Sequence, residues 1–146
     1  RLMANEIKKV YGTQKTVSTS IAAIANNAIS AAVGTYSATD TLDYPYADFV
    51  LVVTFATAPT EGSTSDLLVR PMDVQGANDT VTPQATYQPH RIGTFVVDNV
   101  TAAQYLFCSG FDLPKAGELY LYNNATGQST SANASLYMTP RTLAPV

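Results

Sequence analysis

His90 is the only histidine of the chain, and it is the first residue whose type could support catalysis. A serine hydrolase needs a histidine between a serine and a carboxylate, and Ser109 and Asp98 could complete such a set on paper. No nucleophile-elbow sequence accompanies them, and His90 follows a proline at the expected start of a strand, which is typical of a loop residue. A single histidine also excludes metal motifs with two histidine ligands. We therefore predict no catalytic residue.

Acidic side chains gather in two predicted loops, and oxygen-rich loops can hold calcium. Their spacing matches no familiar calcium loop, and Asp and Asn are common in turns because they hydrogen-bond the local backbone. A glycosidase needs two facing carboxylates, and nothing in the sequence selects a pair such as Asp48 and Glu118. We predict no enzymatic activity, no metal and no cofactor, with calcium binding kept as an alternative. The loop residues concerned are Asp40, Asp43, Asp73, Gly76, Asn78 and Asp79.

The net charge of −3 is distributed unevenly along the 146 residues. Basic residues dominate positions 1–15, whereas acids outnumber bases in the rest of the chain. The acidic balance argues against a nucleic-acid partner, and a basic segment on an acidic body often contacts an acidic partner. We predict an N-terminal arm over residues 1–15, of which residues 1–9 become ordered on binding; a solvated, flexible terminus is the alternative. The candidate contact residues of the arm are Lys8, Lys9, Val10, Tyr11 and Lys15.

Cys108 is the only cysteine and lies in an apolar, strand-like setting. We predict a buried free thiol there, and a single cysteine excludes an intrachain disulfide. No run of 18 apolar residues could span a membrane, and the start of the chain lacks the apolar core of a signal peptide. Residues 3–5, Met-Ala-Asn, are the expected natural start, with Arg1 and Leu2 upstream of it.

Short runs of β-branched and aromatic residues alternate with turn-rich segments along the chain. Such runs predict an all-β fold, and 146 residues suffice for one domain with its own core. We predict a single jelly-roll-like antiparallel β-sandwich over residues 16–146, preceded by the extended N-terminal arm. The expected strands are residues 10–20, 48–55, 67–72, 91–97, 104–109, 118–122 and 134–139.

Four segments carry more specific expectations. Residues 21–33 fit either a helical stripe or two short strands around an Asn26-Asn27 turn, and we favour strands because the rest of the chain is β. The strand 48–55 is apolar at nearly every position, so we expect both of its faces to be covered. Residues 35–47 are predicted to form a loop, and residues 140–146, with two prolines, to be irregular.

The predicted core consists of the apolar residues expected on the inward faces of these strands. An aspartate at one of these positions would be a buried, unpaired carboxylate and is expected to unfold the domain. The predicted core residues are Phe49, Leu51, Val53, Leu67, Val69, Phe95, Val97, Leu106, Leu119, Leu121 and Leu136.

Three stretches of the chain are similar to segments of small virion proteins of tailed bacteriophages. Residues 57–69, TAPTEGSTSDLLV, resemble their hairpin with the pattern T-x-P-T-x-G between two strands. Residues 111–132, FDLPKAGELYLYNNATGQSTSA, resemble their C-terminal segment with L-P-x-G, a strand, N-x-T-G and S-A. Residues 19–28, TSIAAIANNA, are similar to their opening pair of strands.

This resemblance implies a capsid decoration protein, also called a cement protein, with a jelly-roll-like fold. Such proteins lie on the outer surface of the virion head and bind the major capsid protein, often as homotrimers. From the acidic charge balance and the lack of a long apolar run, we predict neither nucleic acid nor a membrane as a partner. The basic arm could then clamp a capsid subunit by adding a strand to an exposed sheet edge.

Two other functions remain open from the sequence. The same fold could serve as a tail or head-fibre component of the virion. The chain could also be a glycan-binding β-sandwich module, because exposed tyrosines make good carbohydrate contacts. Tyrosines more often cap sandwich cores, and the chain has no tryptophan to stack on a sugar. The tyrosines considered are Tyr36, Tyr44, Tyr46, Tyr87, Tyr105, Tyr120 and Tyr122.

Overall fold

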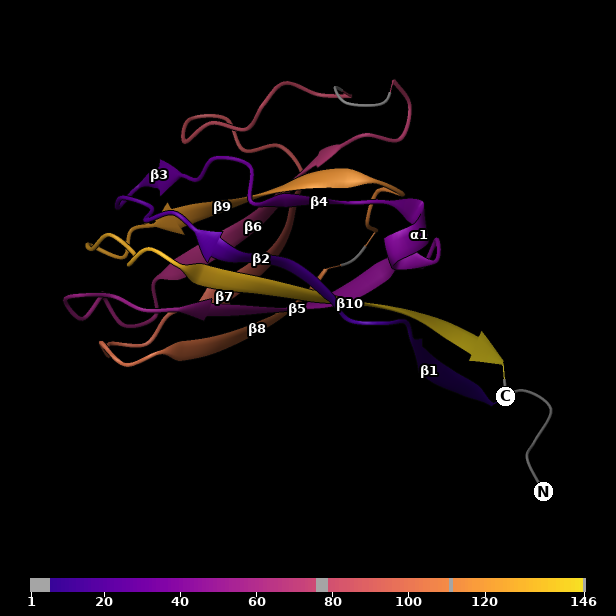
Figure 1. The fold of residues 1–146 in the computed structure, drawn as a ribbon, viewed down its shortest axis with the longest axis horizontal. Coiled ribbons are helices and arrows are strands. Elements are labelled where there is room, and N and C mark those ends of the chain that lie inside the picture. The colour runs from indigo at the N-terminus through magenta and orange to yellow at the C-terminus, as the bar shows by residue number, and fades with distance from the viewer. Residues whose placement is uncertain (1–5, 76–78, 111, 146) are drawn as a thin grey trace.

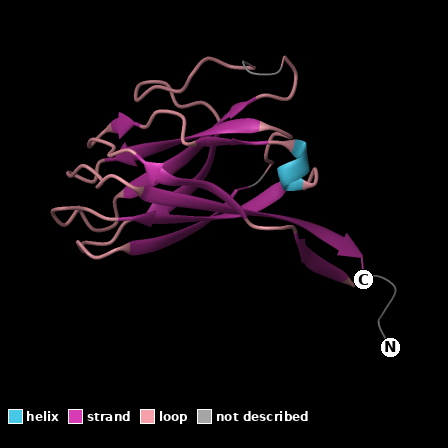
Figure 2. Ribbon diagram, in the orientation of Figure 1, coloured by secondary structure: helices cyan, strands magenta, loops and turns pink. Residues whose placement is uncertain are grey.

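The computed structural model describes residues 6–75, 79–110 and 112–145, and strands account for most of its regular structure (Figure 2). One short helix, α1, lies between β4 and β5. The elements are β1 Ile7–Tyr11, β2 Lys15–Ile21, β3 Ala28–Ile29, β4 Gly34–Tyr36, α1 Ala38–Thr41, β5 Tyr46–Val53, β6 Thr64–Pro71, β7 Arg91–Val96, β8 Gln104–Gly110, β9 Gly117–Asn124 and β10 Ala134–Pro145.

Two antiparallel sheets lie face to face (Figure 1). In sheet A, β5 lies between β10 and β8 and pairs with both. The other edge of β10 pairs first with β2 and then, toward the C-terminus, with β1. In sheet B, β9 pairs with β6 and β6 with β7, while β3 and β4 share the other edge of β9. Each sheet therefore interleaves early and late strands, as a jelly roll does. The predicted all-β, jelly-roll-like antiparallel sandwich is confirmed.

The core lies between the two sheets and is built by the alternation of side chains along each strand. In β5, Phe49, Leu51 and Val53 are buried, whereas the residues between them are half-buried and point outward. The predicted core residues are buried except Leu106, which is half-buried and packs against the core. The expectation that both faces of 48–55 are covered is wrong, because the outward Val50 and Val52 lie on a solvent-accessible face.

Residues 21–33 contain no helix, and the favoured pair of strands is present only in part. Asn27 has a φ of 56° and lies in a turn, as the sequence predicted. The segment after this turn forms only the two-residue β3, and Ile21 ends β2. Ile24 is buried in the core from a non-strand position, which explains the apolar spacing that mimicked a helical stripe. The predicted loop 35–47 also proves to be more regular, since it contains α1 and the ends of β4 and β5.

The C-terminal segment is regular, contrary to the prediction, because β10 continues through both prolines to Pro145. Pro140 faces the break between β1 and β2, where its carbonyl accepts a hydrogen bond from the Gly12 N–H at 2.8 Å. A side chain at Gly12 would place its Cβ 2.7 Å from the Pro140 ring, so this close approach requires glycine. Beyond this point β10 pairs with β1, and both strands extend away from the sandwich (Figure 1).

Candidate functional site

The terminal ribbon, formed by β1 and residues 141–145 of β10, holds most of the predicted arm residues. Lys8, Lys9 and Tyr11 are exposed on it and Val10 is half-buried. Lys15 lies apart from them in β2, where its Nζ forms an ion pair with Asp40 at 2.9 Å. The expectation that residues 1–9 become ordered only on binding is wrong for residues 7–9, because they already pair with β10. Residues 1–5 lie outside the described part of the chain.

One face of the terminal ribbon carries its large exposed apolar side chains, with Lys9 among them. Ile7 pairs with Pro145, and Lys9 pairs with Leu143, so their side chains share a face with Tyr11. Ile7 is 70% exposed and Leu143 is 52% exposed, although both are large aliphatic residues. The pairing of β10 with β5 ends at Arg141, so within the described residues the ribbon has open backbone edges on both sides. Open edges and exposed apolar side chains are features of a surface that pairs with another chain.

A groove of about 610 Å³ crosses the outer face of sheet A. It is built from the outward positions of three neighbouring strands, because Tyr137 of β10 pairs with Val50 of β5, and Val50 with Phe107 of β8. The adjacent row contains Val52 and Tyr105. The groove residues are Tyr11, Gln14, Asp48, Val50, Val52, Tyr105, Phe107, Ser135, Tyr137 and Thr139.

A polar network lies at one end of this groove. The Asp48 Oδ1 accepts a hydrogen bond from the Ser109 hydroxyl at 2.7 Å and forms an ion pair with the Arg141 Nε at 2.9 Å. The Arg141 guanidinium also lies over the Tyr46 ring, 5.3 Å from its centre, in the geometry of a cation–π contact. The Asp48 charge is therefore compensated by a cation that is itself fixed by neighbouring groups.

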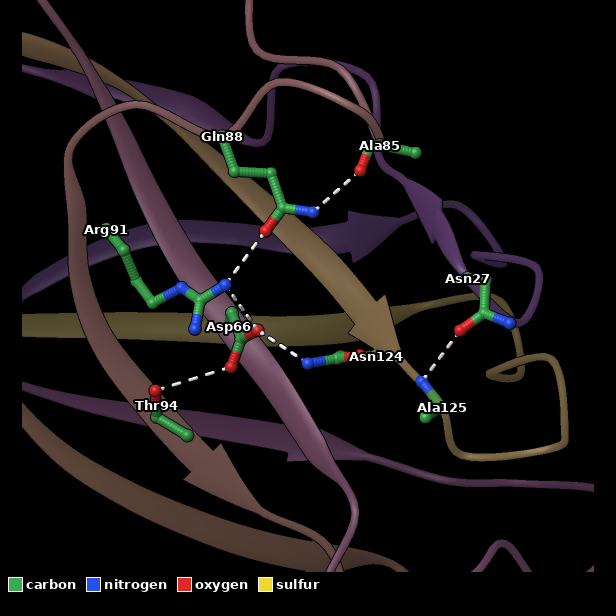
Figure 3. Close-up of polar contacts among 8 residues, drawn as sticks. All are labelled: Asn27, Asp66, Ala85, Gln88, Arg91, Thr94, Asn124 and Ala125. Carbon is green, nitrogen blue, oxygen red and sulfur yellow. Dashed lines mark hydrogen bonds and ion pairs between the residues drawn. The ribbon is translucent and has the colours of Figure 1, made fainter.

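The outer face of sheet B carries a second polar cluster, centred on the fully buried Asp66 (Figure 3). Its carboxylate accepts hydrogen bonds from the Thr94 hydroxyl at 3.3 Å and the Asn124 amide at 3.2 Å. The Arg91 Nη2 lies 3.3 Å from the carboxylate and also donates to the Gln88 side-chain carbonyl at 3.0 Å. Both oxygen atoms of the Asp66 carboxylate have partners, and no buried polar side-chain atom among the described residues lacks one, so the cluster is suited to fixing the segment that leads into β7 rather than to binding a ligand.

The residues of the hypothetical catalytic sets lie on different strands and loops of the structure. His90 is exposed in the loop directly before β7 and has a φ of 57°. The Ser109 hydroxyl donates to Asp48, and Asp98 accepts the N–H of Asn99, so their described hydrogen bonds do not lead to His90. Asp48 faces outward from sheet A, whereas the other carboxylate of the hypothetical glycosidase pair lies on sheet B.

Two of the acidic loop residues, Asp73 and Asp79, accept hydrogen bonds from backbone N–H groups. Asp73 accepts hydrogen bonds from the N–H groups of Lys115 and Ala116, and Asp79 accepts from Val74 and Gln75. These backbone hydrogen bonds lower the pKa of Asp79. No group of three or more potential metal ligands occurs among the described residues. Gly76 and Asn78 of the calcium alternative lie outside them.

Cys108 is a buried free thiol, as predicted. Burial, reinforced by the nearby Asp48 charge, raises the pKa of its thiol to about 12. The Cα of Gly93 approaches it so closely that an added Cβ would lie 2.6 Å from the sulfur. A thiol that stays protonated and is enclosed by the core is unreactive, which makes Cys108 a packing residue.

The comparisons with known proteins yield no family for this chain. No protein-family model matches it, and no curated protein matches it. Among solved structures it is similar to a β-1,3-glucan-binding CBM6 from Bacillus halodurans, with 10% identity over 91% of this chain and 84% of that one and a TM-score of 0.39. It is also similar to a protein of Bacillus endospore appendages, described as disulfide-linked pili, with 11% identity over 100% and 96% of the two chains and a TM-score of 0.27.

The two surfaces that stand out are therefore the terminal ribbon and the outer-face groove. The sequence pointed to the ribbon through its charge, but it did not single out Phe107 or Tyr137. The signal for them in the sequence is that apolar residues occupy both the inward and the outward positions of these strands. No helix among the described residues is long and apolar enough to cross a membrane.

Proposed function

We propose that this protein is a non-enzymatic decoration protein of a bacteriophage head, which binds the major capsid protein on the outer surface of the virion and stabilises the shell. The observation that carries the proposal is the terminal ribbon, which extends beyond the sandwich with exposed apolar side chains and open edges (Figure 1). The resemblance of three sequence stretches to small virion proteins supports the same function.

The terminal ribbon suits a clamp for a physical reason. A partner strand that pairs with an open edge gains main-chain hydrogen bonds, and its side chains can meet Ile7 and Leu143 on one face of the ribbon. Lys8 and Lys9 add positive charge, which favours a partner that is acidic at this point. The sandwich behind the ribbon has one continuous hydrophobic core, so the ribbon projects from a packed domain.

The test uses two ribbon substitutions and a matched control. Bacteriophage heads assembled without this chain are mixed with the wild type, with the double variant Ile7→Asp/Leu143→Asp, and with Val74→Asp. Val74 is 92% exposed but lies between β6 and β7, far along the chain from the ribbon. Co-sedimentation measures the bound fraction. We expect the ribbon variant to bind about tenfold or more weakly, because apolar anchors become charged, and the control to bind as the wild type does.

Each outcome bears on the proposal. Unchanged binding by the ribbon variant would refute the clamp, provided that its unfolding midpoint equals that of the wild type. Binding to isolated tails but not to heads would favour the alternative of a tail or head-fibre component. Glycan binding, the other alternative, would not require the ribbon's apolar side chains.

A homotrimer is part of the proposal, since a symmetric assembly lets three ribbons grip neighbouring subunits at once. Sedimentation equilibrium of the purified protein tests it directly. A mass three times the 15.5 kDa of the chain is expected, and a monomer at micromolar concentration would contradict it.

A further inference from the structure

We propose that the groove on the outer face of sheet A binds a neutral oligosaccharide. This function is separate from capsid attachment through the terminal ribbon and could accompany it in the same molecule. It rests on the groove's shape, its aromatic lining and its balanced charge.

The aromatic lining is the first argument. The solvated face of an antiparallel sheet is usually polar, yet the outward positions here include Val50, Phe107 and Tyr137. Tyr105 is 76% exposed and Phe107 is 63% exposed, so large rings remain in water at considerable cost. Since they are two positions apart on β8, their rings project from the same face roughly 7 Å apart. Two such rings can each meet the apolar face of a sugar ring.

The polar groups are the second argument. Gln14, Ser135 and Thr139 bring amide and hydroxyl groups to the groove, and these can donate to and accept from sugar hydroxyls. The carboxylate of Asp48 is neutralised by Arg141 at 2.9 Å. A charged ligand would find no uncompensated opposite charge among these described groups, whereas a neutral, hydroxyl-rich one would be well matched.

The shape of the groove is the third argument. Its volume of about 610 Å³ lies inside the range of about 300–1,000 Å³ found for small-ligand sites. Its floor consists of β10, β5 and β8; the central strand β5 pairs with both neighbours, whereas β8 is the edge strand of sheet A. A ligand that lies on this floor meets side chains and finds no unpaired backbone groups on β5, so recognition there must come from side chains, as it does for saccharides.

The experiment begins with an array of neutral oligosaccharides, probed with the intact protein. The best-bound oligosaccharide is then titrated by calorimetry into the wild type, Tyr105→Ala and Phe107→Ala. Tyr87→Ala is the matched control, since Tyr87 is 51% exposed but lies in the segment between β6 and β7. We expect each groove variant to weaken binding about tenfold or more and the control to bind as the wild type does. All of the substituted side chains are exposed, so unfolding midpoints should be unchanged.

Three results would overturn the proposal. The first is that no oligosaccharide on the array binds. The second is that the groove variants and Tyr87→Ala bind equally well. The third is concentration-dependent self-association that Phe107→Ala abolishes while no sugar binds, because a second copy would then cover the groove. The ribbon variant Ile7→Asp/Leu143→Asp keeps the two functions distinguishable, since it should lose capsid binding and retain oligosaccharide binding.

Discussion

Asp66 illustrates how a single buried charge organises the outside of sheet B. It is fully buried, and it is the common acceptor for Thr94, Asn124 and Arg91 (Figure 3). Arg91 is half exposed, so water screens its attraction to the carboxylate, and the two neutral donors gain more from the buried oxygen atoms. The network therefore links the side chains of β6, β7 and β9 on the outer face of sheet B.

Replacing Asp66 by Asn should destabilise the protein. The new amide group, itself buried, would direct an N–H donor toward the donor of Thr94 or Asn124, and the one remaining carbonyl oxygen could not satisfy both of them. We expect the free energy of unfolding in urea to fall by about 1–3 kcal/mol. Glu61→Gln, at an exposed carboxylate, is the control and should change it by less than about 0.5 kcal/mol. Equal stability of Asp66→Asn and the wild type would show that the network contributes nothing.

At the scale of elements, the carboxylate of Asp40 in α1 forms an ion pair with Lys15 in β2. Burial of Asp40 pushes the pKa of its carboxyl upward, but hydrogen bonds from Lys15 and from Ser37, which precedes α1, outweigh this and leave the pKa below its ordinary value of 3.8. A carboxyl with a lowered pKa in the folded state stabilises that state above the unfolded pKa. This contribution is lost as the pH falls through the folded value.

The pH dependence of an Asp40→Asn variant should report this link. We expect the variant to be less stable than the wild type at pH 7, because it lacks the ionised partner of Lys15. The difference should shrink as the pH falls below 3.8 and the wild-type carboxyl becomes protonated. Urea unfolding of both proteins at pH 7 and pH 3 provides the measurement. A difference of the same size at both values would assign the effect to packing instead of charge.

The strands show which parts of an element its own sequence determines. The alternation in β5 follows from period-two geometry, but the outward Val50 and Val52 are as apolar as the core residues Leu51 and Val53. The sequence of this strand therefore cannot tell which face is covered. The extension of β10 to Pro145 was missed because its partner, β1, lies at the opposite end of the chain. Prolines count against a strand locally, and a distant pairing overrides that preference.

At the scale of the whole molecule, the sandwich follows from regularly spaced strands and turns, whereas the candidate sites depend on contacts between distant segments. Phe107, Val50 and Tyr137 meet on one surface only because β8, β5 and β10 are neighbours in sheet A. The ribbon likewise joins the two ends of the chain. The charge asymmetry of the sequence indicated β1 as a contact segment. The local sequence does not predict that β1 pairs with the C-terminal end of β10.

The two proposed surfaces adjoin at Tyr11, but their main apolar side chains lie at different places in the molecule. The ribbon's apolar tip, with Ile7 and Leu143, lies beyond the sandwich, while Tyr105 and Phe107 lie on the far strand of sheet A. A protein anchored through its ribbon could therefore leave these rings accessible. Attachment to a capsid and binding of a sugar are compatible on geometric grounds.

The most direct test of the proposed decoration function is cryo-electron microscopy of bacteriophage particles assembled in the presence of this protein. The account predicts density for the sandwich on the outer head surface, at threefold or quasi-threefold positions, with the terminal ribbon against a neighbouring capsid subunit. Density confined to the tail or to a vertex, or the absence of the chain from the particle, would contradict it.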